Sequence, residues 1–90
     1  MNIITNLKDI CYVLLKKCTS LNDTIIVKAY AKTLVAESKL LTAIYNSGHV
    51  TDVTIMNREV DGLYTLRVET SALTTPRGLR NRIAKRLVNL

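Results

Sequence analysis

Apolar residues recur along this 90-residue chain with two different periods, and each change of period predicts a new element of structure. Up to residue 18 the spacing is three and four, which predicts a helix with one apolar stripe and a cap at Thr5 or Asn6. A polar, turn-forming stretch at residues 19–23 ends this helix. Residues 24–30 are rich in β-branched side chains, which favours a strand. The stripe of the first helix comprises Ile3, Leu7, Ile10, Cys11, Leu14, Leu15 and Cys18.

Helical spacing resumes at Ala31 and predicts a second helix, which ends at residues 46–48 because Gly48 tolerates the left-handed backbone of a C-terminal cap. Residues 50–56 and 63–70 predict two further strands. The polar stretch 57–62 between them closes with Asp61-Gly62, a strong hairpin signal. Along the last strand the alternation places Tyr64, Leu66 and Val68 on one face.

The order of these elements predicts an α+β fold, a small α-β-α-β-β domain over residues 1–73 with two helices packed on a three-stranded sheet. Residues 74–90 then form a basic C-terminal segment. A chain of this length makes one domain, and its only aromatic residues are four tyrosines, which limits the core it can build.

Positive charge is concentrated in that last segment. The formal net charge is +6, and no Asp or Glu follows Glu69. Arginine and lysine neutralise phosphates and release counterions, which gives affinity for nucleic acid of any sequence. An acidic membrane or protein partner, or solubility alone, would also account for the charge. If the segment is a helix, its cations are Arg77, Arg80, Arg82, Lys85 and Arg86, around a stripe of Leu79, Ile83, Leu87 and Leu90.

The residues that catalysis requires are sparse. His49 is the only histidine, and the acidic residues include no evident pair. We therefore expect no enzymatic activity, no metal or other cofactor and no small-molecule substrate. Cys11 and Cys18, seven positions apart on a helix, are too distant for a disulfide and are expected to be reduced core residues. No apolar run is long enough to span a membrane, and no membrane partner is expected. No aromatic cluster interrupts the basic residues, which argues against a platform that stacks single-stranded bases.

Four short motifs in order resemble the N-terminal half of the small-subunit ribosomal protein S-eight family. They are the helix end LLKKC, the strand region IIVKAYAKTL, the run GHVTDVTI and the loop LTTPRGLR. The family has Val-Pro-Tyr-Ser-Lys-Leu, Gly-x-Ile-x-Asp-Phe-x-Val and Ser-Lys/Arg-Pro-Gly-x-Arg at the last three places. Here Lys28-Ala29 stands before Tyr30, an extra Arg77 precedes Gly78, and the family's C-terminal domain has no counterpart.

The resemblance implies a structural constituent of the small ribosomal subunit, with small-subunit rRNA and neighbouring ribosomal proteins as partners. The reduced length suggests a mitochondrial ribosome, with a cytoplasmic or other organellar ribosome as the alternative. A small dimeric nucleic-acid-binding regulator or protein-interaction module is the competing function. Lys16 and Lys17 are expected either to contact RNA or to interact with the C-terminus of the first helix. The residues expected to contact RNA are Lys16, Lys17, Lys32, Thr74, Thr75, Arg77, Gly78, Arg80, Arg82, Lys85 and Arg86.

Overall fold

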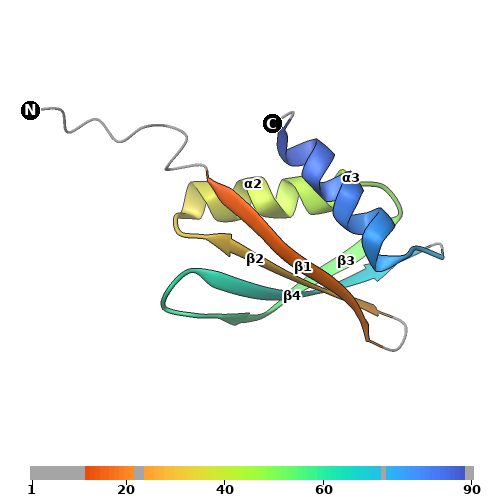
Figure 1. Ribbon diagram of the computed structural model, residues 1–90, viewed down its shortest axis with the longest axis horizontal. Coiled ribbons are helices and arrows are strands. Elements are labelled where there is room, and N and C mark those ends of the chain that lie inside the picture. The colour runs from red at the N-terminus through yellow and green to blue at the C-terminus, as the bar shows by residue number, and fades with distance from the viewer. Residues whose placement is uncertain (1–11, 22–23, 72, 89–90) are drawn as a thin grey trace, which may run out of the picture.

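The computed structural model describes residues 12–21, 24–71 and 73–88. These residues form four strands and two helices, and the helices pack against each other and against one face of the sheet (Figure 1). The elements in chain order are β1 (Val13–Leu21), β2 (Thr24–Ala31), α2 (Leu34–Tyr45), β3 (Val50–Arg58), β4 (Leu63–Thr70) and α3 (Pro76–Val88).

The sheet is antiparallel throughout, with strand order β1-β2-β4-β3. Two hairpins, β1–β2 and β3–β4, therefore lie side by side with β2 and β4 at the centre, and a helix follows each hairpin. The register pairs Val27 with Leu66 and Ile25 with Val68. Because side chains alternate between faces, these pairs set the apolar face of both central strands toward the helices.

The predicted three-stranded sheet and the first helix are wrong: residues 13–21 form an edge strand, and the sheet has four strands. A bulge between Leu15 and Lys17 explains the misleading pattern. The extra residue places Leu15 and Cys18, three positions apart, on the core face together with Val13, so the interval from Leu15 to Cys18 matches a helical spacing that an unbroken strand would not show. The remainder of the predicted helix, residues 1–11, lies outside the described residues.

The other predicted elements form with small shifts at their ends. Helix α2 begins where Thr33 caps it, since the Thr33 Oγ1 accepts a hydrogen bond from the N–H of Ala36 at 3.0 Å. Beyond the helix, Gly48 has a φ of 103°. Strand β3 extends to Arg58, so the turn before β4 is shorter than predicted, and it closes with Gly62 at a φ of 93°. Both glycines occupy left-handed backbone that other residues rarely adopt.

Helix α3 contributes to the same core as the rest of the described chain. Leu79 and Ile83 are fully buried, and Leu87 packs against the same cluster. Part of the basic C-terminal segment is thus a packed helix whose cations are held in place by its apolar stripe. The core consists of Ile25, Val27, Ala29, Ala31, Ala36, Leu40, Ala43, Ile44, Tyr64, Leu66, Val68, Leu79 and Ile83.

Candidate nucleic-acid interface

Helix α3 begins with a side-chain cap that uses two of the predicted RNA-contacting residues. The Thr75 Oγ1 accepts a hydrogen bond from the N–H of Gly78 at 3.0 Å, and its carbonyl accepts one from Leu79 at 3.0 Å. A Cβ atom on Gly78 would lie 3.0 Å from the Thr75 Oγ1 and 3.6 Å from Arg82 Nη1. Gly78 therefore lies in the first helical turn, where it leaves room for the cap and for a guanidinium. Thr74, partly buried, directly precedes this cap.

The buried stripe divides the cations of α3 between two flanks. Helical periodicity places Arg82, Lys85 and Arg86 on one flank, with Arg77 and Arg80 on the other. Arg77, Arg80, Lys85 and Arg86 are exposed, whereas Arg82 is only partly exposed. The five cations therefore do not form a single surface.

Three of these cations converge on a pocket of about 280 Å³ between α3 and the C-terminal end of α2. We call it the cationic pocket and define it by its lining residues, Ser47, Arg82, Lys85 and Arg86. Ser47 is buried, and its hydroxyl donates a hydrogen bond to the carbonyl of Ile44 at 2.6 Å. The described residues that line the pocket include no carboxylate, so its positive charge is not balanced within that lining.

Arg82 is the most constrained of these cations. Its Nε and Nη2 atoms are buried and have no hydrogen-bond partner among the described residues. A buried donor that lacks a partner costs about 1–3 kcal/mol, and more when it is charged. A guanidinium offers planar, forked N–H groups that match the oxygens of a phosphate or carboxylate. Because Arg82 lines the cationic pocket with Lys85 and Arg86, the pocket is suited to bind an oxyanion.

The predicted lysines lie elsewhere. Lys16 and Lys17 are in β1, and Lys32 directly follows β2. For Lys16 and Lys17 the alternative role at a helix C-terminus is excluded, because these two residues lie in a strand. Lys17 pairs across the strands with Lys28, and Lys16 Nζ lies 5.8 Å from the centre of the Tyr30 ring. These lysines belong to the face of the sheet that the helices leave open, so the predicted set divides between two surfaces.

Ser47, Lys28 and Tyr30 also belong to these surfaces but are not among the residues that the sequence predicts to contact RNA. The sequence predicts Ser47 only as part of the segment that ends the second helix, and its place beside α3 depends on tertiary packing. Lys28 and Tyr30, by contrast, share a face of the correctly predicted strand, and their alternation is visible in the sequence. That alternation could have placed Lys28 beside an aromatic ring on the solvent side.

Two other polar groups have shifted pKa values and join elements of the fold. Burial raises the pKa of the Cys18 thiol to about 11, against the opposing charge of Arg80 on α3. Burial, together with its hydrogen bond to Glu37, raises the pKa of Tyr64. The Tyr64 hydroxyl donates to Glu37 Oε1, from which Arg58 Nη2 lies 3.6 Å away. This cluster ties α2 to the β3–β4 hairpin.

Within residues 12–21, 24–71 and 73–88, no group of three His, Cys, Asp or Glu side chains is arranged to hold a metal ion. The helices of this part of the chain are too short and too polar to cross a membrane. Comparison of the sequence with protein-family models and with curated proteins finds no match.

Proposed function

We propose that this chain binds RNA phosphates at the cationic pocket and serves as a structural component of the small ribosomal subunit in a mitochondrial ribosome. The observation that carries the proposal is the convergence of Arg82, Lys85 and Arg86 on one pocket whose described lining holds no carboxylate. Phosphate oxygens are acceptors of the required geometry and charge.

The arrangement of Arg82 favours a ligand over a role in solubility alone. A cation that only solvates a surface extends into water, where its donors are satisfied at no cost. Arg82 instead keeps two guanidinium nitrogens, Nε and Nη2, out of solvent in a residue that lines the pocket with two further cations. Recognition through shape and phosphate contacts is typical of proteins that bind folded RNA.

The ribosomal assignment comes from the sequence resemblance in IIVKAYAKTL, GHVTDVTI and LTTPRGLR, since LLKKC lies in the strand β1 and does not end a helix. Under this assignment the partners are small-subunit rRNA and neighbouring ribosomal proteins. LTTPRGLR spans residues 73–80 and ends within α3, and its Arg77 and Arg80 lie on the flank opposite the cationic pocket.

Salt dependence of RNA affinity tests the phosphate contacts. The triple variant Arg82→Ala, Lys85→Ala, Arg86→Ala should bind a folded RNA fragment more weakly. The slope of log affinity against log salt concentration should fall in magnitude by about 2 to 3. Each phosphate that the variant no longer neutralises contributes roughly 0.7–0.9 to that slope. The double variant Arg77→Ala, Arg80→Ala, on the opposite flank of the same helix, is the matched control and should change the slope by less than about one.

An unchanged slope in the triple variant, or an equal loss per charge in the control, would refute binding at the cationic pocket. Replacement of Arg82 by Lys keeps the charge but removes the fork, so we expect lower affinity with the slope retained. Preferential binding of a dimer to a two-fold symmetric DNA duplex would instead support the small regulator.

A further inference from the structure

The face of the sheet opposite the helices is open and carries its own pattern of side chains. The buried residues of β2 alternate with Ile26, Lys28 and Tyr30, which therefore project away from the core. In the register, Leu14 lies opposite Tyr30, and Lys17 lies opposite Lys28. Apolar, aromatic and basic side chains are thus mixed on the two strands β1 and β2.

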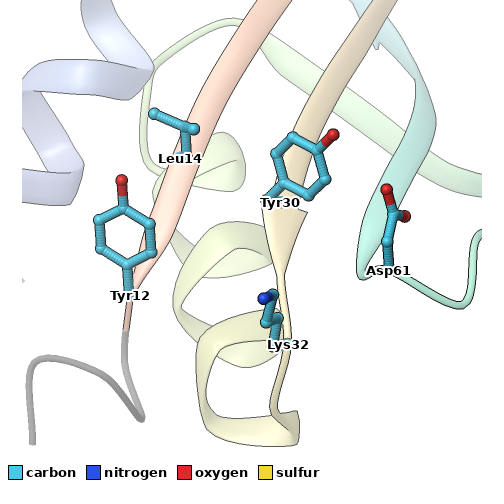
Figure 2. Close-up of a pocket in the computed structure, with 5 residues that line it drawn as sticks. All are labelled: Tyr12, Leu14, Tyr30, Lys32 and Asp61. Carbon is cyan, nitrogen blue, oxygen red and sulfur yellow. The ribbon is translucent and has the colours of Figure 1, made fainter.

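A pocket of about 560 Å³ lies at one end of this face (Figure 2). Figure 2 shows the ring of Tyr30 on β2 and the ring of Tyr12, which directly precedes β1, with Leu14, Lys32 and Asp61 lining the same pocket. Tyr12 is 57% exposed and Leu14 is 41% exposed. The pocket therefore offers aromatic and apolar surface to solvent with one cation and one carboxylate at its rim. A planar heterocycle with hydrogen-bonding edges suits such a lining.

Positive charges beside the pocket favour binding of an anion. Lys17 and Lys28 lie directly opposite each other, an arrangement of like charges that destabilises paired strands. Neither lysine takes part in a salt bridge among the described residues, where the single salt bridge joins Arg58 and Glu37. Lys16 lies over the Tyr30 ring and adds a third positive charge. A polyanion along β1 and β2 would relieve this repulsion.

We propose that the open face of β1 and β2 binds a single-stranded segment of RNA. One unpaired base stacks in the pocket of Tyr12 and Tyr30, and the phosphates beside it contact Lys16, Lys17 and Lys28. This inference rests on the proposed function and adds to it a second RNA-binding surface, which contacts an unpaired base as well as phosphates. Single-stranded RNA presents both groups that the face accommodates, a π surface and a regular series of negative charges.

No aromatic cluster lies next to the cations in the sequence, but in the folded chain two tyrosines lie near basic residues. Tyr12 and Tyr30 are distant in the chain from the cations of α3, but Tyr30 lies beside Lys16, and both tyrosines line one pocket with Lys32. The platform thus arises from strand pairing, and its cations differ from those of the cationic pocket.

The test compares two labelled oligonucleotides of the same length, one an ordinary single-stranded RNA and the other lacking bases but with the same phosphates. The full chain should bind the base-bearing RNA more tightly. Tyr12→Ala should weaken that binding roughly 5- to 150-fold, the range for loss of one stacked base, and should leave binding of the base-free strand unchanged. Tyr12→Phe keeps the ring and should retain affinity. Tyr45→Ala removes a similarly exposed tyrosine, 48% exposed on α2, and should have no effect.

The outcomes separate this inference from the proposed function. Equal binding of both strands, or an unchanged affinity in Tyr12→Ala, would overturn base stacking while leaving phosphate binding at the cationic pocket intact. Failure of both strands and of folded RNA to bind would overturn both. Self-association of the chain at micromolar concentration that Tyr12→Ala abolishes would show that this face binds a second copy, and would also overturn the inference.

Discussion

Replacement of Leu79 by Ala probes whether α3 is part of the folded domain or a separable basic segment. Leu79 is fully buried in the core beside Ile83. Truncation of a buried leucine to alanine destabilises a protein by about 2–5 kcal/mol, through lost burial and the cavity that remains. Domains are stabilised by only about 0.05–0.15 kcal/mol per residue, or roughly 5–13 kcal/mol for this chain. The single change should therefore remove a large fraction of the free energy of unfolding.

Urea denaturation followed by circular dichroism measures this effect. We expect the midpoint to fall with the m-value unchanged, and the melting temperature to fall by at least about 8 °C, at about 4–8 °C per kcal/mol for a domain of this size. The control is Val88→Ala at the other end of the same helix, where the side chain is 84% exposed. An exposed substitution of this kind changes stability by about 0.5 kcal/mol or less.

The reasoning would be refuted if Leu79→Ala and Val88→Ala had the same small effect. That result would mean that α3 is not packed against the sheet in solution. The cationic pocket would then lose its basis as well, because α3 positions three of the pocket's four residues beside the end of α2.

Two further predictions concern the shifted pKa values. In a Cys11→Ser variant at neutral pH, iodoacetamide should modify Cys18 roughly 100-fold more slowly than in the urea-unfolded chain, because burial raises the thiol pKa from an ordinary 9.0 to about 11. The same shift means that the folded form holds this proton more tightly, so the thiol's contribution to stability is present below pH 9 and is lost as pH rises toward 11. Mass spectrometry measures the rate of modification of Cys18. Equal rates in the folded and the urea-unfolded chain would contradict the burial of Cys18. Tyr64→Phe removes the donor to Glu37 and should lower the free energy of unfolding by about 1–3 kcal/mol, because the hydrogen bond that disappears is to a carboxylate, which among the described residues keeps its ion pair with Arg58. An unchanged urea midpoint would count against this link.

Local signals in the sequence were sufficient for β2, α2, β3 and β4. Alternation over Leu63–Thr70, the glycine after α2 and the Asp61-Gly62 turn act within a few residues and need no tertiary information. The edge strand β1 could not be recognised in this way, because its bulge at Lys16 interrupts the period of two and leaves Leu15 and Cys18 at a helix-like spacing of three. Its pairing with β2 is what stabilises it as a strand.

The candidate sites depended on tertiary structure to a greater degree. The apolar stripe of α3 was visible in the sequence, and it determines which flank carries Arg82. That this flank faces Ser47 follows only from the packing of α3 on α2. The meeting of Tyr12 with Tyr30 likewise required β1, which the sequence pattern assigned to a helix. Charge could be read from the sequence, but its division between two surfaces could not.

Sedimentation of a native lysate on a sucrose gradient, with this chain detected by mass spectrometry, tests the central claim that it is an RNA-binding component of the small ribosomal subunit. The account predicts that the chain migrates with the small subunit and is released by high salt or RNase. The triple variant of Arg82, Lys85 and Arg86 should be released at lower salt than the wild-type chain. Recovery of the wild-type chain wholly in the light fractions at low salt, unaffected by RNase, would contradict the account.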